Sequence, residues 1–533
     1  MKGKFWSLMS AFTICFGIKT VAQSADLILL NGKIFTSDTS QIFVQALAIK
    51  GNKIVSVGSN TAIKKFATGN TKTIDLKGKT VVPGFNDAHD HLGSLFAVGQ
   101  SSFFTPFSIP GLSKSEVIDS LVKLVKRSSP NQWIQGTIGL TVFNDTSIRR
   151  RLLDSLAPNN PVALQIMWGH GMILNCKALQ EVGISDNAAN PLSGWYERKA
   201  GTNFITGALY EGAQFPVWQA LSLSDPKNTI KALRIHAREE LAFGITTVQN
   251  MSSNFQGNAA RQFFAEANLP VRTRIIAMPG STERGRSLEE LINTNTRLSQ
   301  YTYTSGIKYV IDGTPLEQTA LMTKPYPNRK DWYGTLNYPI DTIQQILREA
   351  LRGGRQLSMH IVGDSATRVV LRLMKKMASN NEWKLKRVRI EHGDGLKNND
   401  LIQDAKDMGI IIVQTPIHGI ANPLNKWLLT GINMAVGSDA TINPYLNILI
   451  MTTGRVDTRQ NISINQAVIA YTKGSAYAEF AEKEKGTLAK GMLADLAVLS
   501  QDIFTIPAKQ LPATKSIMTI INGKIAFEES EKL

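Results

Sequence analysis

Short apolar runs alternate with polar stretches of helical period through the middle of the chain. Strands that alternate with helices in this way are typical of a parallel sheet or barrel. Eight runs follow the pattern, and eight strand–helix units predict an α/β protein built on a (β/α)8 TIM barrel. The predicted barrel strands are Thr80–Asp87, Ile245–Gln249, Val271–Ala277, Ile307–Ile311, Gln356–Ile361, Val388–Glu391, Ile410–Gln414 and Asn433–Gly437.

The first two predicted barrel strands are separated by far more residues than one crossover connection needs. A structureless loop of that length is uncommon in a compact domain. We therefore predict an inserted subdomain after the first barrel strand, over residues 95–235 or so. This insert has a predicted strand of its own at Pro161–Met167.

Both ends of the chain are rich in short β-runs, whereas the middle is not. Asn-Gly, Gly-Asn and similar pairs between two such runs are typical of hairpins. The simplest arrangement is one small β-sandwich formed by residues 25–80 and 481–533, beside a barrel that spans 81–480. The predicted hairpins join Leu27–Leu30 to Lys33–Thr36, Ala46–Lys50 to Lys53–Val57, and Ile517–Ile521 to Lys524–Phe527, and a further strand is predicted at Leu493–Leu499.

The first residues resemble a secretory signal peptide. Lys2 and Lys4 precede the mostly apolar run Phe5–Phe16, and small residues near Ala22 and Ser24 offer a cleavage site. We predict a signal peptide over residues 1–24 and a soluble exported protein, periplasmic or secreted. No later apolar run reaches membrane length, so stable membrane insertion is not expected.

The chain carries a formal net charge of +17, but its basic residues are scattered. The sequence has no basic arm and no aromatic stacking platform, so a nucleic-acid partner is not expected. A chain of 533 residues exceeds one ordinary core and is expected to form two or three domains. Whether it forms a homo-oligomer stays open.

The segment Asp87-Ala88-His89-Asp90-His91 follows a predicted strand and a Pro-Gly break. Residues two apart in a strand point to the same face, so His89 and His91 can bind one ion from one side. Imidazole is a common ligand of zinc and related metals. The pair therefore indicates a metal site at the end of the first barrel strand.

Four further residues lie in or just after predicted barrel strands, namely Lys308, His360, His392 and Asp439. Side chains at the carboxyl ends of barrel strands converge at one mouth, where catalysis occurs in this fold. The chain has seven histidines, and four of them belong to this pattern. We expect all six residues to form a common site.

Each of these residues also has a structural interpretation. A buried histidine satisfied by the backbone is ordinary, Lys308 could pair with Asp312, and Asp439 could cap a helix that begins at Ala440. His236, on a helical stretch before Gly244, is interpreted as structural.

The six residues, together with several further motifs, resemble the amidohydrolase superfamily. The motifs narrow the resemblance to amidohydrolase family 3, which includes N-substituted formamide deformylases. The resemblance extends over residues 26 to 527 and rests on Pro83-Gly84-Phe85, Gly169-His170-Gly171-Met172, Thr206-Gly207-Ala208-Leu209-Tyr210-Glu211, His360-Ile361-Val362-Gly363-Asp364 and Gly491-Met492-Leu493-Ala494-Asp495.

The resemblance implies two divalent metal ions. His89, His91 and Asp439 would hold the more buried ion, and His360 and His392 the second. Lys308 would be carbamylated and would bridge both ions, because a desolvated lysine near cations has a lowered pKa and its neutral amine takes up carbon dioxide. Zinc is the first expectation for an imidazole-rich site, with manganese and iron left open.

The implied reaction is attack of metal-activated hydroxide on an amide-type carbon. Asp439 would accept the proton of the water and pass it to the leaving amine. His170 would stabilise the oxyanion and contact substrate, or else only pack on Trp168 or cap Asn175. Trp168 and His418 are further substrate-contact candidates, and His418 could instead support the ligands.

The substrate expected from these features is a small N-acyl or N-substituted amide with an apolar group. The bond cleaved would be a carbon–nitrogen bond other than a peptide bond. The loop Gly313–Gly334 is a possible lid over the mouth. Aromatic residues that could form the pocket wall are Phe103, Phe104, Phe107, Trp168, Trp195 and Tyr196.

Two residues differ from those that are common in the family and affect the expected pocket: Asn250, where Asp is frequent, and Gly393, where Ala is frequent. Two other functions stay open. The first is a one-metal deaminase or a lactone or ester hydrolase on the same barrel. The second is a non-catalytic, exported metal-binding protein.

Overall fold

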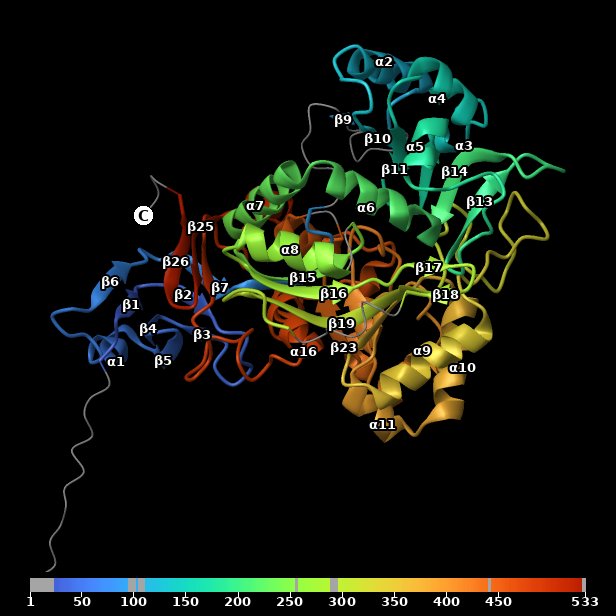
Figure 1. The fold of residues 1–533 in the computed structure, drawn as a ribbon. Helices are drawn as coiled ribbons and strands as arrows, with labels where there is room; N and C mark the ends of the chain where they lie inside the picture. Colours follow the sequence, from blue (N-terminus) through green and yellow to red (C-terminus); the bar gives the residue numbers. More distant parts are fainter. Residues whose placement is uncertain are drawn as a thin grey trace, which may run out of the picture.

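The computed structural model describes residues 24–93, 111–254, 257–287, 296–439 and 442–529, and the backbone strand at 102–103. The predicted signal peptide therefore lies almost wholly outside the described residues. Figure 1 shows a central barrel, a group of strands from both ends of the chain on one side, and the insert on another. Among the described residues, no helix combines the length and apolarity needed to span a bilayer.

The centre of the molecule is an eight-stranded parallel sheet that curves into a barrel, which confirms the predicted (β/α)8 fold. Every neighbouring pair in the sheet is parallel. Its strands, in chain order, are β8 (Phe85–Asp90), β15 (Ile245–Ser252), β16 (Arg272–Ala277), β19 (Thr302–Val310), β20 (Leu357–Ile361), β21 (Arg389–His392), β22 (Ile411–Gln414) and β23 (Asn433–Val436).

Amphipathic helices connect these strands and pack their apolar stripes on the sheet. In α9 (Ile340–Arg352), for example, Ile343, Ile346, Leu347 and Ala350 are buried at helical spacing. The other described helices of the barrel region are α7 (Pro226–Ala242), α8 (Gly257–Ala267), α10 (Asp364–Met377), α11 (Asn380–Lys386), α12 (Asn399–Asp407), α13 (Leu424–Thr430), α14 (Pro444–Thr453), α15 (Ile464–Ile469), a π-helical turn Ala470–Gly474 and α16 (Ser475–Ala478).

The predicted strand Thr80–Asp87 is wrong in one respect, because it is two strands. β7 (Thr80–Pro83) belongs to the terminal sandwich, and the barrel strand β8 begins only at Phe85. The break lies at Gly84, where a Cβ atom would overlap the side chain of Thr246 on β15. This close approach needs glycine and lets the chain pass from one sheet to the other.

The last and first barrel strands meet at a second small residue. A Cβ atom on Gly437 would overlap the backbone of His89. Two residues later, the backbone N–H of Asp439 donates to the carbonyl oxygen of His89 at 2.8 Å. The close approach of β23 to β8 thus brings Asp439 beside the His89–His91 pair.

The two ends of the chain together build a sandwich of two sheets (Figure 1). Its core is formed by residues of both ends, such as Leu29, Ile49, Val498 and Ile520. One sheet contains β1 (Leu27–Leu30), β4 (Ala46–Lys50), β5 (Lys53–Gly58) and β6 (Lys72–Asp75), with α1 (Asn60–Lys64) beside it, and the other contains β2 (Lys33–Phe35), β3 (Phe43–Val44), β7, β24 (Leu496–Leu499), β25 (Ser516–Ile521) and β26 (Lys524–Glu528).

Two of the three predicted hairpins are confirmed, namely β4 with β5 and β25 with β26. The first predicted hairpin is wrong, because β1 and β2 lie in different sheets. β1 is buried along its whole length between β4 and β6, whereas β2 pairs with β3 and β7. Asn31, with a left-handed φ of 56°, turns the chain from one sheet into the other.

The insert has its own six-stranded sheet and an apolar core of its own, and a second core is shared with the barrel residues Met251, Ile276 and Met278. The predicted insert extends too far along the sequence. Residues from Pro226 onward form the barrel helix α7, which packs against α8 and β15. The insert consists of β9 (Ser102–Phe103), α2 (Lys114–Val125), β10 (Ile134–Ile138), α3 (Leu140–Asn144), α4 (Arg150–Leu156), β11 (Val162–Ile166), β12 (Gly171–Leu174), α5 (Cys176–Glu181), β13 (Gly194–Arg198), β14 (Ile205–Glu211) and α6 (Phe215–Ser224), and a small ribbon, β17 (Ser281–Thr282) with β18 (Gly285–Arg286), lies later in the chain.

Candidate metal centre and active site

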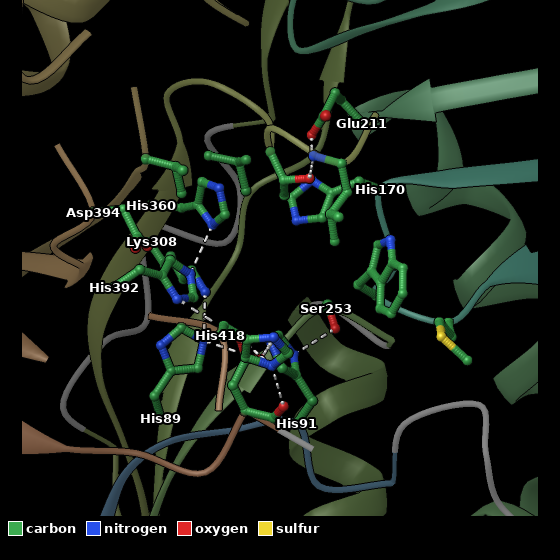
Figure 2. Close-up of a pocket in the computed structure, with 18 of the residues that line it drawn as sticks. His89, His91, His170, Glu211, Ser253, Lys308, His360, His392, Asp394 and His418 are labelled. Carbon is green, nitrogen blue, oxygen red and sulfur yellow. Dashed lines mark hydrogen bonds and ion pairs between the residues drawn. The ribbon is translucent and has the colours of Figure 1, made fainter. Parts of the chain in front are cut away.

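The structure brings all six predicted metal-site residues together at the mouth of the barrel. They line one cavity of about 660 Å³, with the insert on its opposite side (Figure 2). His89 lies on β8, and His91 directly follows that strand. Each of the other four lies on a different barrel strand or in the loop after it. The residues are His89, His91, Lys308, His360, His392 and Asp439.

Around Asp439, the nitrogen and oxygen atoms of these side chains are spaced as the ligands of one ion would be. Asp439 Oδ1 lies 3.4 Å from His91 Nε2 and 3.6 Å from His89 Nε2. In a tetrahedral site with metal–ligand bonds of 2.0–2.1 Å, neighbouring ligand atoms are about 3.4 Å apart. On the other side of the site, His392 Nε2 lies 2.9 Å from His360 Nδ1.

Three of the histidines are held from behind by their second ring nitrogen. Nδ1 of His89 contacts the Glu391 carboxylate at 2.7 Å, and Nδ1 of His392 contacts the Thr415 hydroxyl at 2.8 Å. Nδ1 of His91 contacts the Ser253 hydroxyl and the Met251 carbonyl, each at 3.0 Å. Metal-bound histidines are oriented by such outer contacts, which leave the other nitrogen for the ion. The donor set therefore fits a metal centre.

Below the site, a buried arginine supports the carboxylate that orients His89. Arg389 and Glu391 are both fully buried, and Arg389 donates to both carboxylate oxygens at 2.8 and 3.1 Å. Burial alone would raise the pKa of Glu391, but the charge of Arg389, the hydrogen bond and charge of His89 and the charge of Lys308 together hold that pKa well below its usual range. Glu391 therefore stays an anionic acceptor for His89.

The protonation states of the predicted ligands also suit a metal. Burial, and next the charge of Lys308, lower the pKa of His89 to about 4. Burial likewise lowers the pKa of His360 and His392 well below the usual value. For Asp439, burial acts upward, but the attraction of His89 and other imidazoles outweighs it and lowers the pKa. Neutral imidazoles and an ionised carboxylate are the forms that bind metals.

Lys308 is fully inside the site, with Nζ 2.9 Å from His89 Nε2. Burial lowers the pKa of its amine to about 8. The alternative pairing with Asp312 is wrong, because that carboxylate instead accepts backbone N–H bonds from Leu321, Val362 and Gly363. The helix-cap interpretation of Asp439 is also not supported, since α14 is capped by Asn443.

Backbone strain accompanies the site. His392 and Asp439 have φ values of 74° and 47°, and Glu211 on the insert side has 53°. Non-glycine residues are uncommon in this region, and such strain concentrates where the surrounding structure fixes a functional side chain.

On the insert side, His170 faces the barrel histidines. Its ring centre lies 5.0 Å from that of His360, and its Nδ1 is 2.9 Å from Glu211 Oε2. Burial alone would lower the pKa of His170, but the charge and hydrogen bond of Glu211 outweigh it and raise the pKa to about 9. Asn175 is bonded to other groups, so His170 does not act as its cap.

The other two predicted substrate contacts also border the cavity. Trp168 lines it, and His418 lines it with Nε2 3.2 Å from the Asp439 carbonyl oxygen. The predicted loop Gly313–Gly334 contributes Thr314, Pro315, Leu316 and Met322 to the wall. The structure thus places this loop at the mouth, as expected.

Part of the aromatic prediction is wrong. Trp195 does not line the cavity, since it stacks on Tyr210 with ring centres 4.9 Å apart, and Tyr196 packs against an insert core. Phe104 and Phe107 lie outside the described residues, and Phe103 is described by its backbone alone. The aromatic rings that do line the cavity beside Trp168 are Phe215 and Trp218 of α6.

Sequence reasoning missed several residues around the site, notably Glu211, Glu391 and Asp394. Glu211 and Glu391 are partners of histidines far away in sequence, so no spacing identifies them. Asp394 lines the cavity, and burial raises the pKa of its carboxyl. Its position two residues after His392 was the available signal.

The two residues that differ from the common family sequence, Asn250 and Gly393, have structural explanations. Asn250 is buried in β15, and its side-chain oxygen accepts from the backbone N–H of Leu92 at 2.7 Å, which anchors the chain after His91. Gly393 has a φ of 77°, a conformation that suits glycine. Neither residue lines the cavity.

Comparison with known proteins agrees with this geometry. The model of the amidohydrolase family matches residues 72–527. This chain belongs to the amidohydrolase family. Membership makes it a metal-dependent hydrolase, and the histidine and carboxylate groups at the mouth are candidates for holding its metal.

Two relatives that match more than 90% of this chain carry different functional names. The chain is 27% identical to a putative amidohydrolase, YtcJ, of Bacillus subtilis, over 92% of this chain and 96% of that protein. It is 25% identical to an N-substituted formamide deformylase of Arthrobacter pascens, over 96% and 100%. The structure of an uncharacterized metal-dependent hydrolase from Pyrococcus furiosus superposes with a TM-score of 0.66 at 22% identity, over 90% and 100%, which shows the same fold.

Proposed function

We propose that this amidohydrolase uses two divalent ions to cleave the carbon–nitrogen bond of a small N-acyl or N-substituted amide. The observation that carries the proposal is the convergence of six ligand-type side chains in one cavity, with the far ring nitrogens of His89, His91 and His392 already bonded.

His89, His91 and Asp439 would hold one ion, and His360 and His392 the other. Divalent ions in such a site polarise a carbonyl group and make water an effective nucleophile near neutral pH. Zinc suits the imidazole-rich donor set. Lys308 would bridge as a carbamate, in which its neutral amine nitrogen forms a bond to the carbon of carbon dioxide and releases a proton. The lowered pKa of Lys308 supports this step, since neutral amine is present near pH 8.

Asp439 is the residue that moves a proton. Its carboxylate is ionised and lies at the centre of the mouth, close to His89, His91, His392 and His418. It would accept a proton from the attacking water and deliver it to the amine nitrogen as the carbon–nitrogen bond breaks. The two transfers balance, so that the carboxylate is regenerated.

His170 would act from the opposite wall. Its raised pKa keeps the imidazole protonated at neutral pH. Glu211 fixes Nδ1, which leaves Nε2 as a donor to the substrate carbonyl oxygen while negative charge develops there. The insert would thus complete a site that begins on the barrel.

The wall of the cavity favours an apolar substituent on the substrate. Many of its side chains are apolar and come from the insert, the long loop and the strand ends. An apolar N-substituent or acyl group would displace water there. These side chains are Met167, Trp168, Phe215, Trp218, Met278, Val310, Pro315, Leu316, Met322, Val362, Ile417 and Ile420.

We further propose that the protein acts outside the cytoplasm, in the periplasm or after secretion. The support is the amino-terminal pattern, in which Lys2 and Lys4 precede an apolar run and small residues. The proposed partner is a small amide substrate.

The test is hydrolysis of a panel of N-substituted formamides and N-acyl amines by the purified full-length protein. We expect activity that a chelator abolishes and added zinc restores, with about two metal equivalents per chain at the barrel mouth. One equivalent at the mouth with release of ammonia from an amine-bearing ring would favour the one-metal deaminase. A fully loaded protein without activity toward amides, esters or lactones would indicate a metal-binding protein.

A further inference from the structure

A second cluster of ligand-type side chains lies behind the metal centre, between the barrel and helix α7. Asp90 stands between His89 and His91 on β8, so its side chain points away from the mouth, toward the helix layer. His236 and Glu240, one turn apart on α7, face it. Asp90 and Glu240 are fully buried, and the His236 side chain is 16% exposed.

The atoms of this cluster converge without forming hydrogen bonds. His236 Nε2 lies 3.2 Å from Asp90 Oδ2 and 3.3 Å from Glu240 Oε1. All the converging atoms are within 4.8 Å of one another. Within the described part of the chain, Asp90 Oδ2, His236 Nε2 and both carboxylate oxygens of Glu240 have no hydrogen-bond partner.

A charged pair of histidine and carboxylate is not a good account of these distances. Such bonds are about 2.7–2.9 Å long, whereas both contacts here are longer, and His236 Nε2 has no hydrogen-bond partner among the described residues. One Nε2 proton also cannot satisfy two carboxylates. The distances instead match the ligand–ligand edge of about 3.4 Å in a tetrahedral metal site, and they resemble the 3.4 and 3.6 Å edges at the mouth.

The buried negative charge around this cluster also favours a bound cation. Asp87, Asp90 and Glu240 are three buried carboxylates close enough to repel one another. Asp87 is satisfied by the backbone N–H groups of His89 and Ser438 and by the Tyr471 hydroxyl. Among the described residues, Glu240 has no hydrogen-bond partner, and its contact with His236 Nε2 is 3.3 Å long. A buried carboxylate without a partner is strongly unfavourable, and a bound cation would remove that penalty.

We propose that Asp90, His236 and Glu240 bind a third divalent metal ion of the zinc class. Asp90 Oδ2, His236 Nε2 and the Glu240 carboxylate would be its ligands, and one nitrogen with two carboxylates is a donor set that zinc accepts. The ion ties α7 to β8 directly behind the His89–His91 pair. Its role is structural, since the cluster does not line the catalytic cavity. The interpretation of His236 as a purely packing residue is then incomplete.

The test is the zinc anomalous difference map of crystals of the full-length protein grown with zinc chloride alone. We expect a peak between Asp90, His236 and Glu240 in addition to the density at the mouth. The map shows the two sites separately. An empty mouth with a metal ion bound by Asp90, His236 and Glu240 would contradict the proposed function but not the third metal site. Density at the mouth with none in the cluster would overturn it.

Metal analysis of variants gives a second readout. Glu240→Gln should lose one zinc equivalent per chain and keep the mouth density, while the neighbouring exposed Glu239→Gln should lose none. His360→Asn should do the reverse and lose zinc at the mouth while the cluster stays filled. Melting temperatures would show that each variant is folded, and we expect chelation to lower the melting temperature less in Glu240→Gln than in the parent. Unchanged zinc content in folded Glu240→Gln would contradict the proposal.

Discussion

The barrel side and the insert side of the cavity present histidines in opposite charge states. His360 and His170 have ring centres 5.0 Å apart; His360 is buried, and the His170 side chain is 16% exposed. Burial lowers the pKa of His360 well below its usual value, whereas Glu211 raises that of His170 to about 9. Burial therefore leaves a neutral imidazole on one wall and a cationic imidazole on the other, according to the neighbouring charge.

The two walls also differ in how their residues are held. On the barrel side, the candidate metal ligands extend from strand ends, and His89 is held by a buried network that includes Arg389 and Glu391. On the insert side, Glu211 connects the insert to the barrel, because it contacts His170, Thr319 of the long loop and Asn337 just after that loop. The proposed function assigns metal binding and proton transfer to the barrel, and oxyanion binding and substrate selection to the insert.

The largest effect is expected on the barrel side, from Asp439→Asn. The amide cannot accept a proton, so kcat should fall by about 10²–10⁴-fold, the usual contribution of a general base. Steady-state rates on the best amide substrate, with circular dichroism to confirm the fold, would measure it. Asp341→Asn, an exposed acid on α9, is the matched control and should keep parent rates. Near-parent turnover in Asp439→Asn would refute the assignment.

The barrel half of this comparison could be predicted from the sequence. Five of the eight barrel strands, β8, β15, β20, β21 and β22, are buried along their whole length. The side chains at the strand ends share one mouth by the geometry of the fold. His89, Lys308 and Asp439 could therefore be assigned to one site from their positions alone. Their metal-binding roles stay predictions until an ion is seen.

The insert half could not be predicted to the same extent. Glu211 meets His170 through an antiparallel sheet whose register the local pattern does not specify. For the same reason, Trp195 was assigned to the pocket wall but stacks on Tyr210 across a strand pair. The hairpin expected at Asn31-Gly32 failed likewise, because a turn signal does not say whether the next strand joins the same sheet.

A smaller effect is expected on the insert side, from His170→Gln. Glutamine keeps a hydrogen-bond donor but lacks the positive charge of the imidazolium, so kcat should fall by up to about 100-fold. In the parent, the His170 cation is lost as pH rises through its pKa of about 9, so kcat/KM should fall above that pH. In His170→Gln this alkaline limb should disappear. Persistence of the limb would assign it to another group.

The Glu211→Gln variant tests the charge difference between the two walls while it keeps the imidazole of His170. With the carboxylate gone, burial dominates, and the pKa of His170 should drop toward the values of the barrel histidines. The alkaline limb of kcat/KM should then move to lower pH, which a pH profile would measure. Glu181→Gln, an exposed residue of the insert, is the control and should leave the profile in place. An unmoved limb in Glu211→Gln would contradict the charge difference between the walls.

The smallest effect is expected from Leu316→Ala, in the long loop that meets the insert at the mouth. Leu316 lines the cavity and is 42% exposed in the absence of substrate, so its truncation should barely change the melting temperature. An apolar substrate would cover it, and loss of that contact should weaken binding by about 1 kcal/mol, roughly a five-fold rise in KM with kcat unchanged. Leu385→Ala, on α11 and 78% exposed, should change neither constant. Because the effect should grow with the size of the apolar group, equal KM ratios for small and bulky amides would show that this wall does not select the substrate.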